Sequence, residues 1–131
     1  MDFTISQYKE LLEALTDAGY NFSTFFDFIS SGKIPVAILR HDVDKKPRHA
    51  LKLAQIEHNT GILSSYYFRI LPCSFDPGVI RAIASMGHEI GYHYEDFSLS
   101  YGNAEEAIQT FQTHLNKLKE IAEVKTICMH G

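Results

Sequence analysis

Three side chains able to bind a metal or move a proton lie within four positions at 41–44, where the sequence reads His-Asp-Val-Asp. An imidazole and two carboxylates this close perturb one another unless a cation lies between them. The preceding run at 36–40 is mostly apolar with β-branched members, which predicts a buried strand of a parallel sheet. The polar group is therefore expected at the carboxyl end of a strand, where α/β folds place their chemistry. The alternative is a polar turn in which Asp44 only caps the next helix.

Strands and helices alternate after position 35, and several strand ends carry further polar side chains. Apolar and aromatic content predicts strands at 36–40, 64–70, 89–94 and 125–129, separated by helices at 47–59, 77–86 and 104–121. This order predicts a parallel sheet with right-handed crossovers, in which the connections that follow the strands share one edge. We expect these polar residues to meet there: His41, Asp42, Asp44, Arg69, His93, Glu95 and His130. Histidine and aspartate side chains that converge in this way indicate a metal site.

Residues 1–34 are expected to form a helical cover that has no chemistry of its own. Ser6 is the predicted N-cap of a first helix, which Gly19 ends. A phenylalanine-rich stretch at 21–30 predicts a second short helix, with Gly32 as its stop. Together with the βα units at 35–131, this cover makes a single domain over residues 1–131.

Composition excludes several classes of protein. The chain has 131 residues, 45% of them hydrophobic and 21% charged, as in an ordinary globular domain. Its net charge of −4 argues against a nucleic-acid partner, and no apolar run approaches the roughly 20 residues of a membrane span. Residues 1–4 lack the pattern of a signal peptide, and the spacing of Cys73 and Cys128 suggests neither a disulfide framework nor a metal motif. A cytoplasmic location is therefore expected.

Two segments together resemble a known family of enzymes. His-Asp-Val-Asp at 41–44 and Gly-His-Glu-Ile-Gly-Tyr-His at 87–93, with an aromatic strand between them, resemble the metal-dependent polysaccharide deacetylases, carbohydrate esterase family 4. The resemblance covers residues 35–131 and implies an α/β fold of parallel βα repeats, an incomplete (β/α) barrel. It also implies an enzyme that removes N- or O-acetyl groups from a carbohydrate, using a divalent metal, with zinc as the first choice, to polarise the acetyl carbonyl.

The same resemblance assigns roles to individual residues. Asp42 matches the catalytic base, Asp44 the metal-binding aspartate and His93 the first metal-binding histidine. The remaining polar residues at the shared edge are expected to bind substrate: His41, Arg69 and Glu95.

The third metal ligand departs from the family pattern. The family has a second metal-binding histidine four residues after the first, and Phe97 stands at that position here. We expect His130 to take its place, because it follows a neighbouring strand. Glu95 and Asp96 are the alternatives.

The later motifs of the family, which include its general-acid histidine, have no counterpart in residues 1–131. We therefore expect a truncated member or a piece of a longer protein, and little or no activity from the isolated chain. A non-catalytic relative that binds sugar or only keeps the scaffold remains an alternative. A phosphoesterase is another, although few basic residues are available to it: Arg40, Lys45, Lys46 and Arg69. Four parallel strands leave unpaired edges, so self-association into a homo-oligomer is also expected.

Overall fold

The computed structural model describes residues 4–32, 34 and 36–131, which form a mixed α/β fold with parallel strands in two sheets. The larger sheet has the order β3-β4-β5-β6, from β3 (Arg40–Val43), β4 (Ser65–Phe68), β5 (Glu89–Tyr94) and β6 (Val124–Met129). The smaller sheet pairs β1 (Asn21–Phe22) with β2 (Val36–Ala37). All of these pairings are parallel, which confirms the architecture expected from the alternation of strands and helices.

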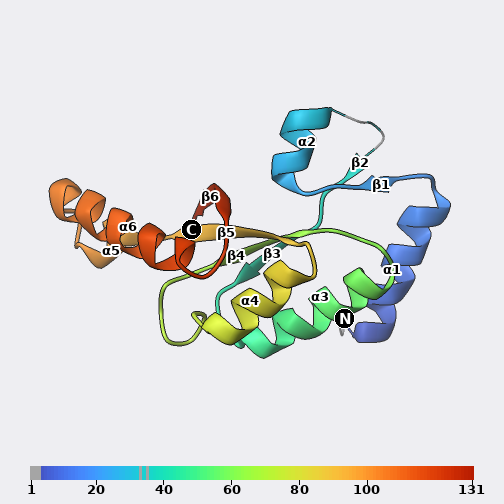
Figure 1. The fold of residues 1–131 in the computed structure, drawn as a ribbon, viewed down its shortest axis with the longest axis horizontal. Coiled ribbons are helices and arrows are strands. Elements are labelled where there is room, and N and C mark those ends of the chain that lie inside the picture. Colours follow the sequence, from blue (N-terminus) through green and yellow to red (C-terminus); the bar gives the residue numbers. More distant parts are fainter. Residues whose placement is uncertain (1–3, 33, 35) are drawn as a thin grey trace.

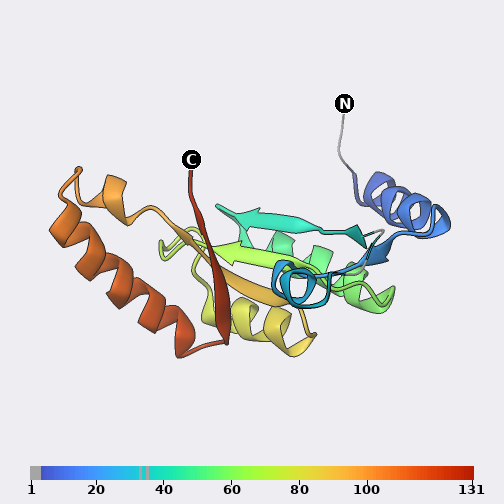
Figure 2. The same ribbon diagram turned by 90° about the horizontal axis from the view of Figure 1, so that it is seen from above.

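Helices lie on both faces of the larger sheet and beyond its ends (Figure 1). They are α1 (Ile5–Asp17), α2 (Phe25–Ser31), α3 (Pro47–Asn59), α4 (Pro77–Ser85), α5 (Asp96–Leu99) and α6 (Ala104–Lys119). In Figure 1, α3 and α4 lie side by side beneath the sheet, while α2 lies above it. Figure 2 shows β6, the edge strand paired with β5, running steeply across the direction of the other strands, with α5 and α6 beyond the end of β5.

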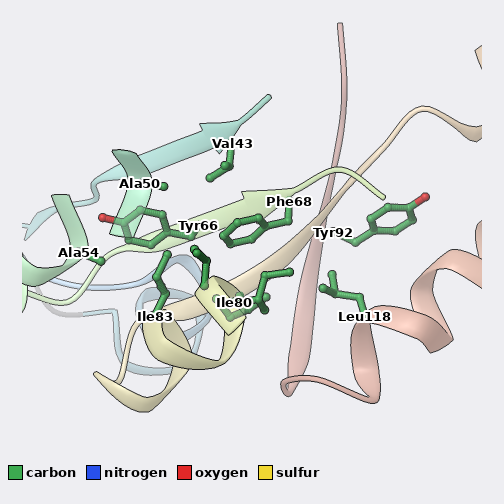
Figure 3. Packing of buried hydrophobic residues seen from close by; sticks show 11 residues of the cluster. Val43, Ala50, Ala54, Tyr66, Phe68, Ile80, Ile83, Tyr92 and Leu118 are labelled. Atoms are coloured by element: carbon green, nitrogen blue, oxygen red, sulfur yellow. The ribbon is translucent and has the colours of Figure 1, made fainter. Parts of the chain in front are cut away.

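The core lies between the larger sheet and the helices beneath it. Side chains of a strand alternate between its two faces, so Tyr66 and Phe68 of β4 point to the same side. Both are fully buried against Ile80 and Ile83 of α4, which Figure 3 shows below the strand. Burying one large apolar side chain contributes about 1.5–3 kcal/mol, and this cluster extends to Leu118 of α6.

The opposite face of the sheet carries polar side chains and a tyrosine under close packing. Tyr67 is 3% exposed, contacts the ring of Phe25 in α2 and shares a hydrogen bond with Thr126. Its ring lies across Gly91 of the neighbouring strand, where a Cβ atom would overlap it. Glycine at position 91 of β5 therefore leaves the space that the Tyr67 ring of β4 occupies.

The helix starts follow the expected chemistry with one correction. Pro47 is the first residue of α3, and Asp76 accepts hydrogen bonds from the backbone of the first turn of α4, as predicted. The first helix, however, is capped by Thr4, with Gln7 completing a capping box, so the prediction of Ser6 as N-cap is wrong. The side chain of Ser6 instead donates a hydrogen bond to a carboxylate one turn later.

The predicted strand at 36–40 is two strands in different sheets, which corrects the position of the first polar group. Residues 36 and 37 form β2 and pair with β1, whereas β3 begins at Arg40 and pairs with β4. Between them, Leu39 accepts a hydrogen bond from the backbone of Ser65. His41 and Asp42 therefore lie within β3 and face opposite sides of it, since alternate residues of a strand point in opposite directions. Only Asp44 follows the strand.

Two further segments differ from their predictions. Residues 21–30 were expected to be one helix, but β1 comes first, and Thr24 then caps α2. The short helix α5 was not predicted, because four residues are too few to show a helical period. The expected boundary between cover and βα units, at 34–35, adjoins residues 33 and 35, which lie outside the described residues.

The outer strands of the larger sheet are β3 and β6, and β6 exposes the side chains of Ile127 and Met129. The expected self-association stays a prediction. In the part of the chain that the structure describes, no helix combines the length and apolar character needed to cross a bilayer.

Candidate metal centre

Three of the predicted residues meet at the carboxyl end of the larger sheet. Asp44 follows β3, His93 lies near the end of β5, and His130 follows β6. Nε2 of His130 is 3.3 Å from Oδ1 of Asp44, and Nε2 of His93 is 3.6 Å from the same oxygen. One ligand atom from each residue lies within 4.8 Å of the other two. The parallel topology thus brings together side chains that are up to 86 positions apart in sequence.

These separations are the ones a small metal ion requires. A tetrahedral zinc ion with bonds of about 2.0–2.1 Å separates its ligand atoms by about 3.3 Å. The two distances to Oδ1 of Asp44, 3.3 and 3.6 Å, are close to that value. Two of the three separations therefore suit a shared cation, and the third, between the two imidazoles, lies within 4.8 Å.

One oxygen of the group has no hydrogen-bond partner among the described residues. Oδ1 of Asp44 is buried and accepts no hydrogen bond, although the imidazoles of His93 and His130 face it. The side chain of Asp44 is 48% exposed as a whole, but a carboxylate oxygen that is shielded from water and accepts no hydrogen bond is unfavourable unless a cation compensates it. Both imidazoles present Nε2 to this same oxygen. A cation bound between the three residues would therefore give the oxygen a partner.

The backbone orients His93 toward this point. Its side chain is 4% exposed, and Nδ1 lies 3.2 Å from the carbonyl oxygen of Cys128, which is its neighbour in the β5–β6 register. Because a carbonyl oxygen only accepts, this contact favours a proton on Nδ1, which makes Nε2, the nitrogen that faces Asp44, the one available to a metal. This is the arrangement in which a histidine acts as a metal ligand.

Asp42 lies beside the three residues and is held by an arginine. Both of its carboxylate oxygens accept hydrogen bonds from Arg40, each at 2.8 Å, and Oδ2 is 3.9 Å from Nε2 of His93. The hydrogen bonds to Asp42 raise the pKa of Arg40, whose guanidinium also lies over the ring of Tyr67. The side chain of Asp42 is 36% exposed, so an incoming molecule can reach it.

Arg69 and Glu95 form a second pair on the other side of the group. Nε and Nη2 of Arg69 donate to the two oxygens of Glu95 at 2.8 and 2.9 Å, and these hydrogen bonds raise the pKa of the guanidinium. Nη1 also reaches the backbone carbonyl of Asp44 at 3.5 Å. Glu95 lies 3.6 Å from Nδ1 of His130 through Oε2.

The structure separates the remaining predicted residues from this site. His41 points to the helical face of the sheet, where its ring stacks on Tyr66 at 4.5 Å between centroids, so it is not brought to the group. Asp96, an alternative ligand, is 2% exposed and bonds Tyr92 and His114 instead. Phe97, four residues after His93, is 59% exposed.

A buried carboxylate that was not predicted from the sequence contacts His41 on the helical face of the sheet. Glu57 of α3 is fully buried, and its Oε1 lies 2.6 Å from Nε2 of His41. It accepts further hydrogen bonds from the hydroxyls of Tyr8, Ser64 and Tyr66. The signal was present in the sequence, since Glu57 follows Ala50 and Ala54 on the inward face of the helix at a spacing of four and three residues.

This cluster shifts the pKa values of its members in opposite directions. Burial pushes the pKa of Glu57 upward, but the hydrogen bond and charge of His41 and the hydroxyl of Ser64 outweigh it and leave the pKa below its ordinary value. Burial, with the hydrogen bond to Glu57 or its charge, raises the pKa of both Tyr8 and Tyr66. The carboxylate is therefore held ionised by neutral donors and one imidazole, and it joins α1, α3, β3 and β4.

Neither a family model, nor a curated protein, nor a solved structure gives a significant match to this chain. The chemistry of the site is therefore argued from its own residues and geometry.

Proposed function

We propose that Asp44, His93 and His130 bind a divalent metal, and that the chain is a metal-dependent hydrolase of the polysaccharide-deacetylase type. The observation that supports this most is the unpartnered Oδ1 of Asp44, with two imidazole nitrogens at 3.3 and 3.6 Å from it. The parallel βα units would correspond to part of a (β/α) barrel. The substrate class is a carbohydrate that carries N- or O-acetyl groups.

The donor set favours zinc within a short list of metals. One carboxylate and two imidazoles suit Zn²⁺ and leave a coordination position open, which distinguishes catalytic from structural zinc sites. The same set accommodates Fe²⁺, Co²⁺ or Mn²⁺, so selectivity has to be measured. Neither Cys73 nor Cys128 belongs to the group of possible ligands, which argues against a thiolate-rich structural site.

Asp42 is the proposed general base. When bound, the metal supplies a Lewis acid for the acetyl carbonyl and lowers the pKa of water at the site. The carboxylate of Asp42 lies beside His93 without belonging to the ligand group, and it is exposed enough to accept a proton there. Arg40 fixes the orientation of this carboxylate through two hydrogen bonds.

Ion pairing of the arginines favours an acetylated substrate over a phosphorylated one. A phosphoesterase needs guanidinium or ammonium groups that are free to bind phosphate oxygens. Carboxylates engage both Arg40 and Arg69 at this end of the sheet. Of the basic residues named above, this leaves only the exposed lysines, Lys45 and Lys46, to bind a phosphate group. An acetyl group carries no charge and makes no such demand.

A slow reaction is expected from residues 1–131 alone. Hydrolysis of an amide also needs an acid to protonate the leaving amine, and such a group contributes about 10²–10⁴-fold. Among the described residues, His93 and His130 belong to the ligand group, and His41 faces Glu57 on the other side of the sheet. The isolated chain therefore has a base and a metal site without an evident acid.

Metal titration tests the site separately from the chemistry. Protein stripped with a chelator is titrated calorimetrically with Zn²⁺, Co²⁺ and Mn²⁺, and one ion per chain is expected. Asp44→Asn should abolish this binding. Asp42→Asn should bind the ion and lose acetate release from N-acetylated oligosaccharides.

The matched control is Asp17→Asn, which makes the same substitution at an exposed position in α1 and should change neither property. Absence of ion binding in the unsubstituted chain would contradict the proposal. Phosphate release from an aryl phosphate would support a phosphoesterase instead. Metal binding with neither product would support a non-catalytic relative.

A further inference from the structure

We propose that Arg69 and Glu95 are positioning residues that hold two of the three metal ligands, His130 and Asp44, in place. This inference deepens the proposed function and rests on its metal site. It replaces the expectation that these two residues bind substrate.

His130 depends on Glu95 for its orientation. Its backbone nitrogen donates to the carbonyl of Tyr94 at 2.8 Å, which places the residue but leaves the ring free to rotate. The ring itself meets His93 edge-on at 5.0 Å, Asp44 through Nε2 and Glu95 through Nδ1 at 3.6 Å. A carboxylate on the Nδ1 side favours the tautomer that carries its proton there, so Nε2 is left to bind a cation beside Asp44.

Glu95 can fill this role because Arg69 fixes it. The two side chains are 11% and 14% exposed, and their paired hydrogen bonds hold the plane of the carboxylate. Arg69 also donates to the carbonyl oxygen of Asp44 at 3.5 Å, so the same guanidinium contacts the backbone of a second ligand. The pair therefore links the ends of β3, β5 and β6 around the ligand group.

The geometry argues against Glu95 as a ligand itself. Both of its oxygens are within 2.9 Å of Arg69, and a cation bound to either would have to compete with the guanidinium. Glu95 is also absent from the group of side chains whose ligand atoms lie within 4.8 Å of one another. A positioning residue and a ligand predict different results when the charge of Glu95 is removed.

The test compares metal affinity and the Co²⁺ absorption spectrum in four proteins. They are the unsubstituted chain, Glu95→Gln, the double variant Arg69→Met/Glu95→Gln, and the control Glu123→Gln. Glu123 pairs with Lys125 at 3.2 Å outside the ligand group, so its substitution removes a surface ion pair of similar length. The double variant removes both charges together, because Arg69 left unpaired in a nearly buried position would lower stability for an unrelated reason.

Glu95→Gln is expected to weaken Co²⁺ and Zn²⁺ binding about 10–100-fold, with an unchanged Co²⁺ spectrum at saturation. The double variant should lose no more than about twofold beyond that, because the two residues act as one unit. The control should keep its affinity within twofold, and the melting curves of the metal-free proteins report any loss of folding separately.

An affinity of Glu95→Gln within twofold of the unsubstituted chain would overturn the inference while leaving the metal site intact. A changed Co²⁺ spectrum at saturation would also overturn it, since Glu95 would then be a ligand. If the unsubstituted chain binds neither ion, the proposed metal site fails, and this inference fails with it.

Discussion

Replacing the buried carboxylate of Glu57 with an amide should strongly destabilise the fold. In Glu57→Gln one acceptor oxygen becomes a donor, and it would then face His41 or the hydroxyls that now donate to the carboxylate. Glu57 is fully buried, so bulk water does not compensate the loss. Removing one partner of a buried, hydrogen-bonded charge costs about 3–5 kcal/mol of unfolding free energy.

The corresponding change in melting temperature follows from the length of the chain. Unfolding entropy is about 2.1 cal/mol/K per residue, which for 131 residues gives about 0.28 kcal/mol/K. A loss of about 3–5 kcal/mol should therefore lower Tm by about 11–18 °C, as measured by calorimetry or circular dichroism at pH 7.5. The matched control is Glu13→Gln in α1, an exposed position, where Tm should fall by less than about 2 °C.

Lowering the pH should reduce the difference in Tm between the unsubstituted chain and Glu57→Gln. The pKa of Glu57 is lower in the folded chain than its ordinary value of 4.5, so its stabilising effect is present above that value. The effect is lost as pH falls through the folded-state pKa. A fall in Tm of less than about 3 °C at pH 7.5, or a difference that does not shrink toward pH 3, would refute this account of Glu57.

Three further changes test other parts of the fold. Gly91→Ala should lower the unfolding free energy by about 1–3 kcal/mol in a denaturant titration, because the new Cβ overlaps the ring of Tyr67. Thr4→Ala should cost about 1 kcal/mol through loss of the N-cap, whereas Ser6→Ala should cost far less. Burial lowers the pKa of His88 below its ordinary value of 6.5, so below that value the unfolded chain binds a proton that the folded chain resists. Stability should therefore fall as pH drops below about 6.5, and by less in His88→Gln.

Each of these expectations can fail in a recognisable way. Equal stability of Gly91→Ala and the unsubstituted chain would mean that the ring of Tyr67 can move aside at no cost. A larger effect of Ser6→Ala than of Thr4→Ala would contradict the observed cap. Parallel stability profiles of His88→Gln and the unsubstituted chain below pH 6.5 would show that this imidazole is not held neutral.

Local sequence determined the elements and the residues that meet at one end of the sheet. The proline at the start of α3 and the limits of β5 were predicted from the residues alone, because caps, glycines and apolar periods act over a few positions. The parallel order of strands followed from their alternation with helices. From this order, His130 was expected beside Asp44 and His93, and the structure brings the three together.

Tertiary structure alone decided which face each side chain occupies and which groups pair. His41 and Asp42 are adjacent in sequence, yet one contacts Glu57 beneath the sheet and the other contacts Arg40 above it. Alternate residues of a strand face opposite sides, so the two side chains separate because both lie inside β3. The sequence predicted one strand that ended before them, whereas β3 begins at Arg40.

The pairing of Arg69 with Glu95 likewise joins residues that follow different strands, and no short-range sequence pattern predicts it. Long-range pairing of charges depends on how the strands register and twist, which in turn depends on the packing of the whole core. Sequence therefore identified the atoms able to bind a metal, while the fold determined which of them share one point in space.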